Sequence, residues 1–212
     1  MKDEAVRGGF GLVVMAGFLL LAGCAGTGEV VNLDVRFKPT DVQPVDTQPL
    51  KIVVETFEDK RADKSKLGLR THLWGGVTYF NVPGGRPGEV AAQALADYLR
   101  LRGWKVGVRT PGVTTAEGEP DILLTGQVME FSANAKSRFF STAVNTGTRF
   151  VIRARNAVDG STTTMNLDGS RSETVFWFDP EDVQRLLNET LKESLDRLMA
   201  DTKIENGAWR LK

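Results

Sequence analysis

The first long pattern in the chain is an uninterrupted apolar run over residues 8–23, which carry no charged side chain. A membrane-spanning helix needs about 20 apolar residues to cross roughly 30 Å of hydrocarbon, so this run is too short to span. Its length and N-terminal position are typical of a secretory signal peptide. The alternative is a buried helix that ends at Cys24, with the thiol packed as a small core residue.

A second pattern, strict alternation of apolar and polar residues, begins a few positions later and predicts a strand with one buried face. Its apolar members are Val31, Leu33, Val35 and Phe37. Residues 39–49 then contain three prolines in a polar stretch, which predicts an extended connector. We therefore assign residues 1–23 to a signal peptide, 24–49 to the N-terminus with a short strand and connector, 50–204 to a compact domain and 205–212 to a C-terminal tail.

Five further segments of the compact domain have the composition of strands. Residues 51–57, 104–108 and 121–131 are rich in β-branched and apolar side chains. Residues 148–158 and 162–167 flank Asp159-Gly160, and an Asp-Gly pair between alternating runs predicts a hairpin. Asp168-Gly169 follows the same turn logic. The charged segment 58–66 has no apolar periodicity and predicts a solvated loop, with a docking site for an anionic group or partner as the alternative.

Two amphipathic helices complete the pattern. Over residues 85–103, Pro87 suits a first helical turn and Gly103 suits a left-handed C-terminal position. Asp179 can cap a second helix that runs to Met199, with an apolar stripe at helical spacing and a Glu193–Arg197 pair on its flank. The fold class predicted is α+β: a two-layer, mostly antiparallel sheet of about five or six strands with two amphipathic helices on one face.

Composition narrows the function classes. An apolar fraction of 41% is globular, and 27 basic residues balance 27 acidic ones. This balance gives no basic excess for phosphate neutralisation, so we expect no nucleic-acid partner. Cys24 is the only cysteine, which excludes a disulfide within the chain.

The tetrad Leu21-Ala22-Gly23-Cys24 resembles the lipobox of bacterial lipoproteins. This resemblance implies cleavage before Cys24 and acylation of its thiol, which makes Cys24 the lipid-attachment site. Two or more acyl chains hold a protein stably on a membrane, each buried methylene contributing about 0.8 kcal/mol. Ala25, in place of the Asp that retains such proteins in the inner membrane, implies an outer-membrane location with the domain in the periplasm.

The compact domain is similar to the YajG-type bacterial lipoproteins. The similarity lies in a strand that ends in Phe57-Glu58-Asp59-Lys60-Arg61, a Gly-Pro helix start and the Gly103-Trp104 exit. More distantly, the layout resembles accessory lipoproteins of envelope transport and assembly, including auxiliary components of ABC transporters. The resemblance implies no catalytic residues.

No constellation in the sequence indicates catalysis, a metal or a cofactor. His72 is the only histidine and no G-x-S-x-G motif occurs, so neither a nucleophile–base pair nor a histidine-rich zinc site is expected. We interpret His72 as a surface or hydrogen-bonded residue. The glycine-rich residues 81–88 lack the Gly-Lys-Ser/Thr ending of a phosphate loop and are interpreted as a turn. Carboxylate pairs have no positive support, because spacing in sequence does not give their separation.

Aromatic residues beside basic ones give the candidate surface for a partner or a lipid headgroup, with a role in the core as the alternative. The candidates are Trp74, Tyr79, Phe80, Arg138, Phe139 and Phe140. We expect a non-enzymatic, lipid-anchored periplasmic protein that binds a protein or an envelope polymer as an accessory or assembly factor. The alternatives are a carrier or sensor of a small amphiphile, an auxiliary component of an ABC-type transporter and, with least support, an envelope hydrolase.

Overall fold

The computed structural model describes residues 27–38, 50–112 and 119–212. The predicted signal peptide, Cys24 and the connector predicted at 39–49 lie outside these ranges. None of the helices within them is long and apolar enough to cross a membrane.

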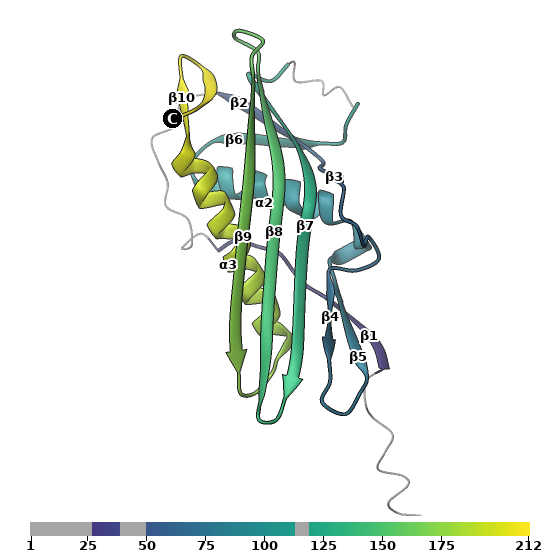
Figure 1. Cartoon of the computed structure of the whole chain (residues 1–212). Helices are drawn as coiled ribbons and strands as arrows, with labels where there is room; N and C mark the ends of the chain where they lie inside the picture. The colour runs from purple at the N-terminus through teal and green to yellow at the C-terminus, as the bar shows by residue number, and fades with distance from the viewer. Residues whose placement is uncertain (1–26, 39–49, 113–118) are drawn as a thin grey trace, which may run out of the picture.

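Three long strands run the length of the molecule (Figure 1). They are β7 (Ile122–Arg138), β8 (Ser141–Asn156) and β9 (Thr162–Val175), and they form an antiparallel meander. The 17 residues of β7 span about 55 Å at the usual rise per residue. Residue Met129 forms a bulge in β7, where the register with β8 shifts between Val128 and Glu130.

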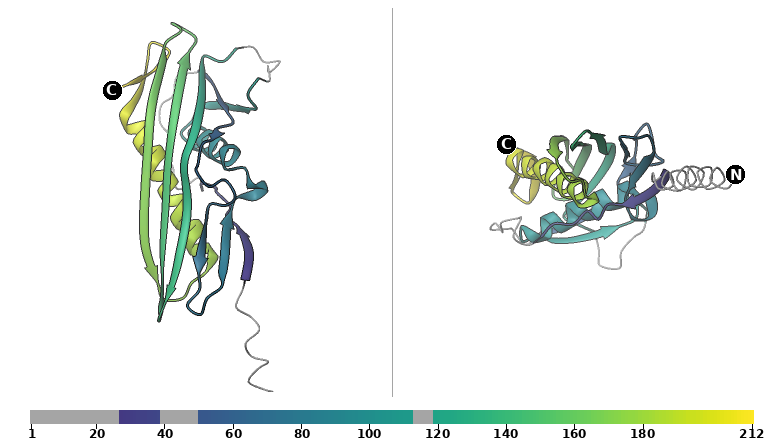
Figure 2. Two further views of the ribbon diagram at one scale, coloured as in Figure 1. Left: turned by 45° about the vertical axis from the view of Figure 1, so that its right-hand side comes forward. Right: turned by 90° about the horizontal axis from the view of Figure 1, so that it is seen from below.

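The second edge of β7 pairs in turn with three short strands, all parallel to it. These are β2 (Lys51–Glu55) near its start, β3 (Glu58–Asp59) near its middle and β4 (Gly68–Thr71) near its end. Beyond β2 lies β6 (Lys105–Arg109), and beyond β4 lie β5 (Val77–Asn81) and then β1 (Thr27–Asn32). Figure 2 shows how the sheet curls. On its other side, β9 pairs only with β8 among the described strands and is an edge strand.

The predicted sheet was therefore too small and too regular. An α+β fold with two helices is confirmed, but the sheet has nine strands and is mixed, not a two-layer antiparallel sheet of five or six. The reason lies in β7 and β8, whose inward positions near the β7–β8 turn hold small or polar residues such as Ala133, Ala135, Thr142 and Thr146. Small side chains give a weak alternation of hydrophobicity, so strands of 17 and 16 residues looked much shorter in the sequence.

Both helices lie behind the long strands in Figure 1. Helix α2 (Pro87–Leu101) follows a short 3-10 turn, η2 (Pro83–Gly85), and packs against β2 and β6. Helix α3 (Pro180–Asp201) packs along β8 and β9. The Tyr98 hydroxyl of α2 donates a hydrogen bond to Asp196 Oδ1 of α3 at 2.5 Å. Burial, reinforced by this carboxylate, raises the pKa of Tyr98 and keeps the phenol protonated as the donor.

The predicted ends of the helices are confirmed. Gly103, just beyond α2, has a φ of 108°. At the start of α3, Asp179 accepts a hydrogen bond from the Glu181 N–H while Asp182 accepts one from the Asp179 N–H, which forms a capping box. The predicted Arg197–Glu193 pair is present at 2.6 Å.

A polar seam joins α3 to the sheet. The hydroxyls of Thr146 and Thr190 lie 2.6 Å apart, and those of Thr148 and Ser194 lie 2.8 Å apart, all four buried. Gly169 of β9 faces the same seam, and a Cβ built on it would lie 2.4 Å from Ser194 Oγ. Asp168-Gly169 is therefore not the turn we expected. It lies inside β9, where the glycine lets the helix approach the strand.

Two other predicted segments differ in detail. The strand predicted through Phe37 leaves the ladder after Asn32, although Leu33 is buried and its N–H still reaches Asn81 O. The charged segment 58–66 is not wholly a solvated loop. Its first two residues form β3, and the Arg61 side chain is only 6% exposed because Asp59 and the Lys66 carbonyl take its hydrogen bonds.

The last residues of the chain form a hairpin of β10 (Thr202–Glu205) and β11 (Ala208–Leu211), where the sequence had indicated only a tail. Trp209 in β11 is buried and its ring lies 6.2 Å from that of Trp104. Its backbone exchanges two hydrogen bonds with the Asn156 side chain at the end of β8. The hairpin thus closes the end of the core that lies opposite the β7–β8 turn.

We predict that Gly169→Ala destabilises the protein by about 1–3 kcal/mol, because the added methyl overpacks a seam that includes the Thr190 carbonyl at 2.8 Å. Urea denaturation followed by circular dichroism measures the effect. Gly107→Ala is the matched control, since its Cβ would meet only Val53 Cγ2 at 3.7 Å. Equal unfolding free energies for the two variants would contradict the close approach of α3 to β9.

Candidate functional site

One end of the molecule carries a cluster of exposed aromatic side chains, which we call the aromatic tip. It is formed by three connections: the β4–β5 turn, the β7–β8 turn and the segment between β9 and α3. Its members are Trp74, Phe139, Phe140, Phe176 and Trp177.

Strand register brings these connections together. Arg138 pairs with Ser141 across the β7–β8 turn, and Thr142 pairs with Val175, so the residues after β9 lie beside that turn. Thr71 pairs with Lys136, which places the β4–β5 turn on the other side of the same turn. Figure 1 shows the three connections at the lower end of the molecule.

The first described residue of the chain lies at this end too. Thr27 of β1 pairs with Val77, the first residue of β5 after the turn that carries Trp74. The described part of the chain therefore begins next to the aromatic tip. Figure 1 and the left view of Figure 2 show β1 at the lower end.

All five tip residues are exposed, and three of them form a chain of ring contacts. Trp74 is 84% exposed and its ring lies 6.4 Å from that of Phe139, which in turn lies 5.6 Å from Phe140. Trp177 is 93% exposed. Phe140, itself 83% exposed, has a φ of 60°, a left-handed conformation that is costly for a bulky residue. Because the Phe140 ring is exposed, its burial does not offset this conformational cost.

Basic groups surround the aromatic tip. Lys136 and Arg138 are exposed near the end of strand β7, and their side chains make no ion pair or hydrogen bond within the described ranges. The Arg70 guanidinium lies 3.8 Å from the centre of the Phe178 ring and donates to Ser137 Oγ. Nearby, His72 Nε2 is hydrogen-bonded to Thr78 Oγ1 at 2.9 Å, as the sequence interpretation allowed. Burial, then the Arg70 charge, lowers the pKa of His72, so it is neutral at pH 7.

The structure brings together four of the six residues proposed for a partner surface: Trp74, Arg138, Phe139 and Phe140. Phe80 is fully buried, because alternation along β5 directs it into the core against Phe178, and it does not belong to the surface. Tyr79 is half-buried, with Lys66 Nζ 5.3 Å from its ring centre.

Sequence reasoning missed Phe176 and Trp177. The signal was present, since these aromatics directly precede Phe178 and the helix cap Asp179, but neither falls on an apolar strand or helix face. Consecutive aromatic residues outside any regular element are a pattern that can be searched for.

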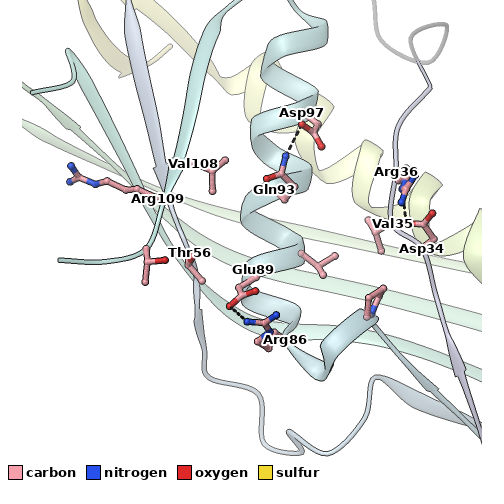
Figure 3. A pocket seen from close by; sticks show the side chains of 13 residues that line it. Asp34, Val35, Arg36, Thr56, Arg86, Glu89, Gln93, Asp97, Val108 and Arg109 are labelled. Carbon is pink, nitrogen blue, oxygen red and sulfur yellow. Dashed lines mark hydrogen bonds and ion pairs between the residues drawn. The ribbon is translucent and has the colours of Figure 1, made fainter. Parts of the chain in front are cut away.

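A hollow of about 800 Å³ lies beside α2, well away from the tip (Figure 3). Charged groups dominate its wall, and most are already paired: Arg36 with Asp34, Arg86 with Glu89, and Arg109 with Glu55. Figure 3 shows two of these pairs, Arg36 with Asp34 and Arg86 with Glu89. No group of three or more potential metal ligands exists among the described residues.

The face of the long strands that points away from α3 is polar. Exposed hydroxyl and amide side chains follow β9 there, among them Thr162, Thr164, Asn166, Ser170, Ser172 and Thr174. On β8, Arg149 pairs with Asp168, whereas Arg153 and Arg155 make no ion pair within residues 27–38, 50–112 and 119–212. Their pairing partners are neutral: Thr125 and Thr164 for Arg153, and Leu123 and Thr162 for Arg155. This outer face therefore offers hydrogen-bond donors and two free positive charges.

Comparisons with known proteins bear on the fold. No protein-family model matches the chain, and no curated protein matches its sequence. A solved structure, XCC0632 from Xanthomonas campestris, described by the family model DUF330, is similar with a TM-score of 0.51 at 13% identity over 80% of this chain and 92% of that one. The chain shares this fold.

Two looser similarities have TM-scores below 0.5. Lipoprotein GNA1162 from Neisseria meningitidis matches with a TM-score of 0.36 at 14% identity over 68% of this chain and 97% of that one. A PelC dodecamer from Paraburkholderia phytofirmans matches with a TM-score of 0.39 at 14% identity over 72% of this chain and 90% of that one.

We predict that Phe140→Asn raises the free energy of unfolding by up to about 1 kcal/mol, because Asn tolerates the left-handed conformation that Phe resists. Phe139→Asn is the control, since that residue has no positive φ. Urea denaturation of both variants provides the measurement. A loss of stability in Phe140→Asn would show that the ring contributes to the fold and that its exposure is not a cost.

Proposed function

We propose that this protein is a lipid-anchored lipoprotein of the bacterial outer membrane. It acts without catalysis as an accessory factor that binds an envelope component from the periplasmic side. The observation that carries the proposal is the position of Thr27 at the aromatic tip, three residues after the lipobox cysteine. A chain tethered at Cys24 holds this end of the fold against the membrane.

The tether is short enough to set the orientation of the fold. Three residues reach at most about 11 Å when fully extended. The long strands then carry the rest of the domain away from the bilayer, because β7 alone spans about 55 Å. The polar outer face of β8 and β9 stands along this axis and is displayed to the periplasm.

We assign partner binding to that outer face and favour an anionic envelope polymer. The guanidinium groups of Arg153 and Arg155 are unpaired, and threonine hydroxyls flank them, which suits hydrogen bonding to carboxylates and sugar hydroxyls. Protein interface cores, in contrast, are enriched in aromatic residues and depleted in charge. Anchoring restricts the search for a polymer close to the membrane and raises its effective concentration.

The other functions considered have weaker support in the described residues. An amphiphile carrier needs an apolar cavity, but the hollow beside α2 is open and lined by paired charges. An auxiliary role in ABC-type transport, like the YajG resemblance, agrees with the lipobox and the Gly103-Trp104 exit from α2 but has no further support in the geometry.

Cys24→Ser is expected to abolish acylation and cleavage, because the thiol is the acyl acceptor. Fractionation of cells and mass spectrometry of the mature N-terminus measure the effect: the native protein should begin at an acylated Cys24, whereas the variant should remain uncleaved. The matched control Thr27→Ser changes a hydroxyl residue just beyond the lipobox and should be processed normally. A native protein with an intact Met1 and a free thiol would contradict the anchor.

The double variant Arg153→Gln and Arg155→Gln is expected to weaken polymer binding about fivefold, since two exposed charge contacts together contribute about 1 kcal/mol. Co-sedimentation with isolated cell-wall sacculi measures the effect, and binding should also fall with added salt. Arg36→Gln is the control, because Arg36 is paired with Asp34 at the far side of the fold. If the wild-type protein does not sediment with sacculi, the polymer assignment is wrong.

A further inference from the structure

We propose that the aromatic tip inserts into the headgroup region of the membrane that carries the lipid anchor. The lipid bilayer is then a second ligand of the domain, bound by side chains and independent of the acyl chains. This inference rests on the proposed anchoring at Cys24, and it assigns a role to the five tip residues that anchoring alone does not require.

The start of β1 lies beside the aromatic tip. Thr27 pairs with Val77, and the β4–β5 turn with Trp74 extends beyond that pair toward the end of the molecule. A tether of at most about 11 Å keeps Thr27 close to the lipid-modified residue. A folded protein layer is at least as thick as one helix, about 10–12 Å, so little room is left for a protein partner between the tip and the bilayer. The short tether therefore favours lipid as the occupant.

The exposed rings of the aromatic tip have the chemistry of a membrane interface. Trp74 and Trp177 present indole rings, which favour the membrane interface because an apolar ring and an N–H donor suit its polarity gradient. Phe139, Phe140 and Phe176 supply apolar area and are between 68% and 83% exposed. Exposed aromatics at one end of a soluble domain form the kind of apolar patch that marks an interaction site.

The backbone of the β7–β8 turn holds an aromatic residue in a left-handed conformation. Gly, Asn or Asp usually occupies a left-handed turn position, yet the chain places Phe140 there with a φ of 60° and an exposed ring. The conformation directs the ring outward beside Phe139 at the extreme end of the hairpin. An exposed phenylalanine in this conformation costs stability in water, and the cost is recovered if the ring leaves water for lipid.

Basic side chains lie beside the aromatic tip. Lys136 and Arg138 flank the tip without ion pairs among the described residues, and they complement anionic lipid headgroups. Two nearby acidic groups are already engaged: Asp179 caps α3, and Glu173 pairs with Arg185 at 2.8 Å. Glu29 of β1 is exposed on the neighbouring strand, so the basic excess lies on the side of β7.

Tryptophan fluorescence tests the insertion with the natural chain. The acylated protein, purified from membranes, is reconstituted into vesicles of phosphatidylethanolamine and phosphatidylglycerol whose acyl chains carry bromine, a contact quencher. Trp104 and Trp209 are buried, so the double variant Trp74→Phe and Trp177→Phe reports the core emission alone. We expect brominated lipid to reduce the tip emission by about half and to leave the core emission unchanged, because interfacial indoles lie at the headgroup level.

Aqueous iodide provides the complementary measurement, since reconstitution should protect the tip emission from it. Tip emission that is insensitive to bromine and open to iodide in vesicles would overturn the proposal. Protection from iodide in native envelopes but not in pure lipid vesicles would also overturn it, in favour of a protein partner. Vesicle flotation separates the two hypotheses: a protein that does not float lacks the anchor, whereas one that floats without bromine quenching has the anchor but no inserted tip.

Discussion

The structure depends on the hydrogen-bonding capacity of one strand. One edge of β7 is filled by β8 along its whole length, and the other is shared by β2, β3 and β4, which bind at successive positions. Each short strand has a connection that must return to this shared edge, so the length of β7 sets the distance between the α2 half of the fold and the tip. The bulge at Met129 lets the strand twist between the sites where β3 and β4 bind.

Helix α3 gives this long, narrow sheet its stiffness. The helix lies along β8 and β9 over most of their length, and the hydroxyl pairs of the seam fix its height on the strands, because each buried hydroxyl needs its partner. Arg171 and Arg185 add ion pairs between strand and helix on the exposed flank. These contacts support β8 and β9, the strands that lead to two of the three tip connections.

Local signals predicted the helices and several strands but not the size and mixed pairing of the sheet. Pro87 and Asp179 mark helix starts through their own backbone chemistry, and Asp159-Gly160 marks the β8–β9 turn, so short windows of sequence were sufficient. Pairing of β2, β3 and β4 with one strand is a long-range arrangement that no window records. The tip was half predicted for the same reason: Phe139 and Phe140 adjoin basic residues in sequence, whereas Phe176 and Trp177 join them only through strand register.

The free edge of β9 has a consequence for crowding. Its outward backbone groups have no strand partner among the described residues, and an unpaired edge of 14 residues is a template for another chain. The anchor proposed at Cys24 would hold this edge at the same height in every copy on one membrane, which would reduce the cost of aligning two edges in register. Most exposed side chains of β9 are threonine, serine or asparagine, so pairing of two such edges would bury little apolar surface.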